Sequence, residues 1–372
     1  MGLLDYYRQF EEVDLERLNR EWRARRARER RLPLERVPDL DLSGTEWPEF
    51  PNSEVVNASI YTARGRVNGY PDRHATAIRR ALAERHELAP EQIVVGNGAA
   101  ELLQAAAMAL LSAGDELLTP WPSYPLYPLM ATRAGAKPVA VDTGPDGTEL
   151  DGLVEAVGGR TRVVVLCNPN DPTGTFLRAD AVGALLSSLP DHAYVLLDEA
   201  LMHFEDLEDM DSCLRLIEVF PRLLVFRTFS KIYGLSGLRA GYAVGSTAAG
   251  AVLDAIAPVL GVNALTQSAI DQALKIAGPD VERRRAMVVR ERTRLLGALR
   301  ELPVDTTRSQ ANFLWLRAPG LSGAELAGRL RAQGVLVAEG GPLGAADHVR
   351  ASIRDPSSGE RFLSALRQAL PR

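Results

Sequence analysis

The chain has 372 residues, of which 46% are apolar and 24% charged, and its formal net charge is −5. This composition predicts a packed globular core, and the acidic balance argues against nucleic acid as the main partner. No apolar run reaches the length of about eighteen residues that a membrane span needs, and the first residues do not resemble a signal peptide. The two cysteines form no metal-ligand or disulfide pattern, so we expect a reducing, cytoplasmic setting and no metal site.

The first part of the chain, residues 1–40, is expected to form an N-terminal helical arm. Residues 11–31 contain no Gly or Pro and interleave Arg with Glu. This interleaving favours a solvated helix with acid–base pairs over a basic arm that binds nucleic acid. Pro33 and Pro38 end the segment, and residues 39–51 are expected to be extended and rich in turns.

Strands and helices alternate through the middle of the chain. Short, continuous apolar runs predict strands that are buried on both faces of a parallel sheet. We therefore expect a three-layer, doubly wound, mainly parallel α/β sheet in a large domain over 41–262, with an opening segment at 41–63. The predicted strands are 92–95, 116–119, 138–141, 162–166, 194–197, 223–226 and 241–244, and the predicted helices are 74–86, 102–111, 179–189 and 212–220.

A smaller α/β domain is expected over the C-terminal residues 263–372. A long helical stretch at 269–299 is interrupted near Gly278 and Pro279. The later apolar runs predict further strands and two helices. These strands are 312–316, 335–337 and 348–353, and the helices are 323–333 and 359–370.

Residues that can bind a ligand follow several of the predicted strands. Ligands of doubly wound sheets bind beyond the carboxyl ends of the strands. The loop at 168–174 and Asp198 both come at such ends. Another strand leads through glycines into a helix at Gly98-Ala99-Ala100. Free backbone N–H groups and the helix dipole face an anion there, so this turn predicts a phosphate site.

Lys231 is one of only three lysines in a chain whose other basic residues are almost all arginine. A lysine can lose its proton in a dry pocket and become a nucleophile, whereas an arginine cannot. Lys231 lies in a hydroxyl-rich loop that continues to Arg239, a fixed cation that suits a phosphate. The buried strand-end carboxylate of Asp198 also needs a cationic partner, and a pyridinium nitrogen would serve. The pattern indicates a Schiff-base lysine beside a phosphorylated cofactor.

Taken together, these segments resemble the class I/II aminotransferases, which are fold-type I pyridoxal-phosphate enzymes, and among them histidinol-phosphate aminotransferase and its relatives. The resemblance extends over about residues 40–370. It rests on the segments 70–72, 96–102, 168–174, 198–200, 228–239, 262–267, 310–313 and 350–353.

The resemblance implies pyridoxal 5′-phosphate as the cofactor and amino transfer between an α-amino acid or similar amine and a 2-oxo acid. Lys231 would hold the cofactor as a Schiff base and shuttle the proton at the substrate carbon. Asp198 would pair with the pyridine nitrogen. The phosphate would be held by Ala99, Ala100, Thr228, Ser230 and Arg239, together with Tyr70 of a neighbouring subunit, which implies a homodimer with shared active sites.

Two further roles follow from the resemblance, each with an alternative. Tyr124 would stack on the cofactor ring, and the alternative is an ordinary core aromatic. Arg350 would bind the substrate α-carboxylate with its two-pronged guanidinium, and the alternative is a salt bridge on a strand.

Two positions depart from the family pattern around the cofactor O3′ oxygen. The family usually has Asn where this chain has Asp171 and often Tyr where it has Leu201, so both usual O3′ donors are missing. An ionised carboxylate accepts hydrogen bonds and cannot donate one. Asp171 is therefore protonated, turned away, or holds a proton on O3′ or on the imine.

Another departure concerns the substrate. Histidinol-phosphate enzymes tend to carry Arg after the strand at 335–337, where this chain has Ala338 and Glu339. Losing that phosphate partner removes several kcal/mol of binding, on the order of 2–5 kcal/mol. We therefore expect histidinol phosphate to be a poor substrate.

Other activities remain open from the sequence. A decarboxylase, cyclase or epimerase of the same fold uses the same cofactor site, because the reaction depends on which bond of the substrate carbon lies perpendicular to the ring. A non-catalytic binding protein with a degenerate site is disfavoured, because Lys231, Asp198 and Arg239 are all retained.

The missing O3′ donors lead to a first prediction. Because nothing stabilises a phenolate at O3′, the imine nitrogen of the Schiff base should keep its proton at neutral pH. The absorbance of the bound cofactor, titrated with pH, measures this directly. Deprotonation well below neutrality would contradict the hypothesis.

Overall fold

The computed structural model describes residues 20, 38–142, 144 and 150–371. Residues from Leu40 onward form one compact unit. The expected N-terminal arm, residues 1–40, lies almost entirely outside the described residues.

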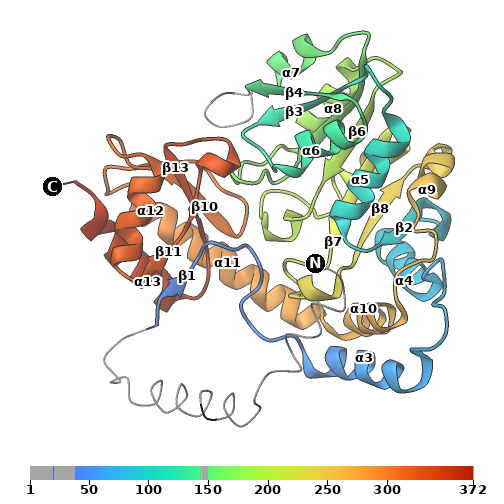
Figure 1. The fold of residues 1–372 in the computed structure, drawn as a ribbon, viewed down its shortest axis with the longest axis horizontal. Coiled ribbons are helices and arrows are strands. Elements are labelled where there is room, and N and C mark those ends of the chain that lie inside the picture. Colours follow the sequence, from blue (N-terminus) through green and yellow to red (C-terminus); the bar gives the residue numbers. More distant parts are fainter. Residues whose placement is uncertain (1–19, 21–37, 143, 145–149, 372) are drawn as a thin grey trace. The chain divides into compact units, whose positions relative to one another are not determined.

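A seven-stranded sheet organises the larger part of this unit, in the order β2-β8-β7-β6-β5-β3-β4 (Figure 1). All neighbouring strands are parallel except β8, which is antiparallel to both β2 and β7. The expected mainly parallel sheet is confirmed. Its strands are β2 (Ile93–Gly96), β3 (Glu116–Trp121), β4 (Lys137–Asp142), β5 (Thr161–Cys167), β6 (Tyr194–Asp198), β7 (Leu223–Thr228) and β8 (Gly241–Gly245).

Alternate strand residues enter two separate apolar cores, one on each face of the sheet. In β5, Val163 and Val165 join one core while Val164 and Leu166 join the other. This division confirms the three-layer fold, because a sheet buried on both faces needs helices on both sides. One face is covered by α5 (Ala99–Leu110), α6 (Leu126–Arg133) and α9 (Gly250–Ile256), and the other by α4 (Thr76–His86), α7 (Asp151–Ala156), α8 (Ala179–Ser188) and α10 (Ala264–Ile276).

Two local expectations differ from the structure. The predicted helix at 212–220 is a run of turns around a short 3-10 helix, η3 (Leu214–Glu218). Its buried residues Leu214 and Ile217 are three apart, which suits the three-residue turn of a 3-10 helix. Helix α3 (Ser53–Arg66) was not predicted, because only Val55 of its residues is buried and the segment has little apolar periodicity.

The C-terminal part contains an antiparallel sheet in the order β12-β13-β10-β9. Helix α11 follows α10 after a break at Ala277, close to the expected interruption. The elements here are α11 (Gly278–Leu299), β9 (Asp305–Thr306), β10 (Phe313–Arg317), α12 (Gly323–Ala332), β11 (Val335–Leu336), β12 (Ala338–Glu339), the short 3-10 helix η6 (Gly341–Leu343), β13 (His348–Ser352) and α13 (Pro356–Ala369). Four further 3-10 helices lie earlier in the described chain: η1 (Pro90–Gln92), η2 (Met202–Phe204), η4 (Ser236–Leu238) and η5 (Thr247–Ala249).

The start of the expected opening segment joins this C-terminal part. Strand β1 (Leu40–Asp41) pairs in parallel with β11, and Figure 1 shows it in blue among the orange and red elements. The backbone N–H of Ser352 donates to the carbonyl of Leu42 at 2.9 Å. The start of the opening segment is therefore held by β11 and Ser352 of the C-terminal part, and the segment continues from there to the large sheet.

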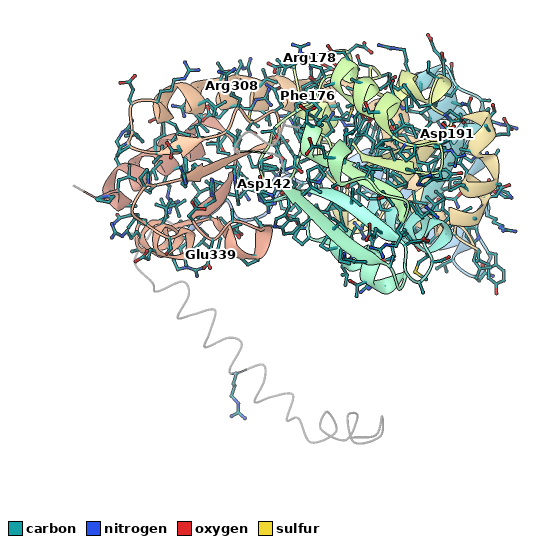
Figure 2. All side chains as sticks on the ribbon, turned by 90° about the horizontal axis from the view of Figure 1, so that it is seen from above. Asp142, Phe176, Arg178, Asp191, Arg308 and Glu339 are labelled. Atoms are coloured by element: carbon teal, nitrogen blue, oxygen red, sulfur yellow. The ribbon has the colours of Figure 1, made fainter. Side chains whose placement is uncertain are left out.

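The large sheet and the C-terminal part also meet at the end of β4. Figure 2 labels Asp142, the last residue of β4, beside the C-terminal part. Asp142 lines a hollow together with Thr306 and His348.

A buried ion-pair network fixes the ends of β6 and β7. Arg227 is fully buried, and its guanidinium donates to Glu199 at 2.8 Å and to Asp211 at 2.7 Å. Glu199 follows Asp198 directly, and Arg227 precedes Thr228. The network thus fixes Asp198 and Thr228, two candidate site residues, relative to each other. Among the described residues, no helix is long and apolar enough to cross a membrane.

Candidate active site at the carboxyl ends of the strands

Most of the predicted site residues line one cavity at the carboxyl ends of β5, β6 and β7. This is the edge at which a doubly wound sheet binds its ligands. Tyr70 and Arg350, which were also predicted, are not part of that lining. The predicted residues that line the cavity are Ala99, Ala100, Tyr124, Asp171, Asp198, Thr228, Ser230, Lys231 and Arg239.

One end of the cavity is built to receive an anion. Helix α5 begins at Ala99, and its first N–H groups have no partner within the helix. Gly98 before it has φ +98°, and a Cβ at Gly98 would lie 2.5 Å from a guanidinium nitrogen of Arg239. A Cβ here would push the guanidinium away, and the positive φ also disfavours any other residue. The helix dipole and this cation favour a phosphate at the same place.

Two hydroxyls stand beside this cation. Thr228 Oγ1 lies 3.0 Å from Ser230 Oγ, and the backbone N–H of Ser230 donates to Thr228 Oγ1 at 3.1 Å. Arg239 donates to the Ser236 carbonyl at 2.9 Å and holds a left-handed backbone at φ +51°. Such a strained conformation persists where the surroundings determine it, as they do here. These residues fit the phosphate of pyridoxal phosphate.

Asp198 is a buried carboxylate at the end of β6. Tyr127 donates its hydroxyl to Oδ2 at 2.9 Å, and the Ala200 N–H donates to Oδ1 at 3.0 Å. Burial raises the pKa of Asp198 to about 6, and the hydrogen bond from Tyr127 opposes this shift. Among the described residues no cationic side chain forms an ion pair with Asp198, so its carboxylate fits a protonated pyridine nitrogen.

Lys231 lies mostly buried in the loop after β7. Burial lowers the pKa of Lys231, although the carboxylates of Asp171 and Glu46 act in the opposite direction. Its Nζ donates to Thr45 Oγ1 at 2.5 Å. A lowered pKa increases the fraction of neutral amine, which is the form that forms a Schiff base.

The position of Asp171 answers part of the question that the sequence raised. Its carboxylate accepts a hydrogen bond from the guanidinium of Arg350, in an ion pair whose side chains are 10% and 11% exposed. Asp171 is therefore turned towards a cation. Leu201 lines the cavity without offering a donor. The alternative reading of Arg350, a salt bridge on a strand, describes its contact in this structure.

The remaining aromatic candidates occupy different surroundings. Tyr124 is 38% exposed, lines the cavity and lies edge-on to Tyr127 at 5.8 Å between ring centroids. Its stacking on a cofactor stays a prediction. Tyr70 is 87% exposed in the loop after α3, so a role for it in the cavity of its own chain has no support.

Several residues of the site were not singled out from the sequence. Thr45 and Glu46 belong to the segment before α3, and its contacts with the C-terminal part help to hold them beside Lys231. The Asn312 amide, for example, donates to the Thr45 carbonyl at 3.1 Å. Tyr127 lies three residues after Tyr124, a helical spacing that could have suggested a shared face.

Cys167 was also not expected to line the cavity. Burial raises the pKa of the Cys167 thiol well above its usual range. The neutral thiol is a poor nucleophile, so Cys167 does not compete with Lys231.

The Tyr127–Asp198 hydrogen bond makes a testable prediction about pyridoxal phosphate, the cofactor that the resemblance implies. Removing the bond in Tyr127→Phe should raise the pKa of Asp198 further, because that bond favours the ionised carboxylate. In wild type the loss of cofactor affinity should follow the protonation of Asp198 as the pH falls through about 6. In the variant the midpoint should move up by about one pH unit.

The measurement is the dissociation constant of the cofactor across about pH 5 to pH 8. The phosphate of the cofactor titrates equally in both proteins, so only the difference between them is interpreted. Tyr194→Phe, at the opposite end of β6, is the matched control and should leave the midpoint unchanged. A uniform loss of affinity at every pH in Tyr127→Phe would indicate a purely structural role.

Comparison with known proteins agrees with this geometry. The family model for aminotransferases of class I and II matches residues 39–366. An aromatic amino acid aminotransferase of Corynebacterium efficiens is 39% identical over 300 residues, covering 80% of this chain and 85% of the relative. A histidinol-phosphate aminotransferase of Nitrosococcus oceani is 34% identical over 331 residues, covering 89% of each chain.

Solved structures of this family share the fold. The histidinol-phosphate aminotransferase of Sinorhizobium meliloti, in complex with pyridoxal-5′-phosphate, has a TM-score of 0.78 at 25% identity and covers 90% of this chain and 91% of its own. A mutant aspartate aminotransferase of Thermus thermophilus has a TM-score of 0.79 at 25% identity, with coverage of 90% and 98%. The chain belongs to the class I and II aminotransferases, and it is a fold-type I transferase that uses pyridoxal phosphate.

Proposed function

We propose that Lys231, Asp198 and Arg239 perform the amino transfer of this family in the cavity at the strand ends. The observation that supports this most strongly is their combination in one cavity with the start of α5. Pyridoxal phosphate, when bound, withdraws electrons from the amino-bearing carbon of the substrate. The side chains bind and orient the two reactants and move the proton.

Lys231 is the proposed catalytic residue. Its Nζ would hold the cofactor covalently, and the free amine would be the group that moves the proton of the amino-bearing carbon of the substrate. Thr45 Oγ1, at 2.5 Å, accepts a hydrogen bond from the released amine and orients it.

The other proposed roles are in binding. Asp198 would pair with the pyridine nitrogen and keep it protonated, supported by the hydrogen bond from Tyr127. Tyr124 would stack on the ring. The first N–H groups of α5, at Ala99 and Ala100, would bind the phosphate together with Thr228, Ser230 and Arg239.

For the substrate, we favour an amine without a phosphate. Ala338 is the cross-strand partner of Arg350 and offers no charge to a phosphate, and Glu46 adds a carboxylate to the cavity lining. Relatives named as aromatic amino acid aminotransferases make aromatic amino acids the first donors to test.

A panel of amino donors tests the function. Adding a competent donor to the holoenzyme should convert the absorbance of the bound cofactor to that of its amine form, and a 2-oxo acid should restore it. Histidinol phosphate should react with a kcat/KM about a hundredfold below that of the best donor, because the carboxylate of Glu46 would face its phosphate. Release of carbon dioxide or racemised donor without conversion of the cofactor would instead identify a decarboxylase or an epimerase.

We also propose a homodimer with shared active sites. Apolar and aromatic side chains are exposed before, within and after α3, and a second copy is the partner that the resemblance implies. In that dimer Tyr70 contacts the cofactor phosphate of the neighbouring subunit. The exposed side chains are Phe50 (96%), Tyr61 (80%), Val67 (71%) and Tyr70 (87%).

Mixed dimers test whether Tyr70 serves the partner. A Lys231→Ala chain and a Tyr70→Phe chain, co-expressed with different tags, should form a heterodimer in which one site has both defects and the other has none. That intact site should bind the cofactor with wild-type affinity, whereas neither parent homodimer should. If Tyr70 acts within its own chain, no intact site forms and wild-type binding does not return.

Two broader proposals remain. We propose a large domain over 41–262, with an opening segment at 41–63, and a small domain over 263–372, with β1 reaching across to β11.

We also propose a reducing, cytoplasmic setting, which suits the buried thiols of Cys167 and Cys213.

A further inference from the structure

The guanidinium of Arg350 already has a carboxylate partner within the protein. Arg350 lies on β13, between β10 and β12, and its side chain lies over the ring of Phe313 at 5.3 Å. One terminal nitrogen donates to Asp171 Oδ1 and the other to the Ser43 carbonyl at 3.3 Å. The buried Nε has no partner. Both terminal nitrogens of the fork are thus in use.

The cavity is lined by Asp171 and not by Arg350. A carboxylate that enters the cavity therefore meets the carboxylate of Asp171 before it reaches the guanidinium. To take the terminal nitrogen that Asp171 occupies, it has to displace Asp171 from a mostly buried ion pair, and the displaced carboxylate then remains beside it. Both steps oppose the binding of an anion.

The other charges of the lining do not compensate. In the proposed function Arg239 binds the cofactor phosphate, Lys231 binds the cofactor, and Asp198 pairs with its ring nitrogen. What remains for the substrate is the Arg350–Asp171 pair and the carboxylate of Glu46. Apart from the proton expected on the Schiff base, every cation of the described substrate side is therefore already paired with a carboxylate.

The backbone around Asp171 is anchored, so Asp171 can move away only by rotating its side chain. The Asn170 side chain donates to the Pro122 carbonyl at 3.0 Å, and its backbone N–H donates to the Thr175 carbonyl at 2.8 Å. The loop is also tied to the C-terminal part, because the Gln310 N–H donates to the Gly174 carbonyl at 2.6 Å.

We propose that Asp171 is an internal counter-ion of Arg350, which weakens the binding of carboxylates and favours amino donors whose amino-bearing carbon carries a neutral group. The proposal rests on the proposed amino transfer at this site. The 2-oxo acid of the second half-reaction has to displace Asp171, so its KM should be high. Asp171 is then a specificity-determining residue.

Equilibrium binding of a non-reactive pair of ligands to the holoenzyme tests the proposal. Phenylpropionate carries a carboxylate, and phenylpropionamide is its neutral counterpart. In Asp171→Asn the carboxylate should bind about tenfold more tightly or better, equivalent to about 1.4 kcal/mol, because Arg350 is released. The affinity for the amide should not change. Asp171→Ser, which is also neutral, is a second variant with the same expected direction.

The double variant Asp171→Asn/Arg350→Gln is the control for the partner. If the gain comes from Arg350, the double variant should bind phenylpropionate no better than wild type. A gain that persists without Arg350 would show that Asp171 acts only through its own negative charge, and would contradict the counter-ion role.

A pair of reactive donors provides a second readout. The ratio of kcat/KM for L-phenylalanine to that for L-phenylalaninol should rise about tenfold or more in Asp171→Asn. Any effect of the new amide on the cofactor O3′ is shared by both donors and cancels in the ratio.

The outcomes separate this inference from the proposed function. If the wild-type protein transfers amino groups but phenylpropionate binds Asp171→Asn and Asp171→Ser no more tightly than wild type, the counter-ion role is overturned. The aminotransferase assignment then stays intact. A wild-type protein that does not take up pyridoxal phosphate, or that converts no donor, would contradict the proposed function itself.

Discussion

The buried guanidinium of Arg227 is the interaction on which the geometry of the site depends. It bonds Glu199 and Asp211, and so fixes the chain next to Asp198 and Thr228. Breaking such a buried pair by removing one partner costs about 3–5 kcal/mol, because the other charge stays behind. The polar network therefore keeps a carboxylate at the end of one strand and a hydroxyl at the end of the next in fixed relation.

Positive and negative groups lie at different places in the cavity. The start of α5 and Arg239 form a positive end that suits a phosphate, and Asp198 is a buried carboxylate that suits a protonated ring nitrogen. The carboxylates of Asp171, Glu46 and Asp198 act against the lowering of the pKa of Lys231 by burial. The substrate side differs, because Arg350 is paired with Asp171. In the proposed function, the residues that hold the cofactor are thus different from the Arg350–Asp171 pair proposed to set the selectivity.

The C-terminal part contributes to the site through segments that are distant in the sequence. Thr45 and Glu46 reach Lys231 because the preceding strand β1 pairs with β11, and because the Asn312 amide binds the Thr45 carbonyl. Asp171 and Arg350 are 179 residues apart in sequence. Such contacts join the large sheet to the C-terminal sheet beside the site itself.

The sequence by itself determined the alternating strands of the large sheet, the glycine turn before α5 and the positions of Lys231 and Asp198 after strands, because apolar periodicity and strand ends are local properties. It did not determine α3, which buries little, or the 3-10 turns around Leu214, where buried tertiary neighbours decide the conformation. Only the tertiary structure placed Tyr127 on Asp198, Thr45 on Lys231 and Asp171 on Arg350. These are long-range contacts between side chains, and no local pattern encodes which residue meets which partner.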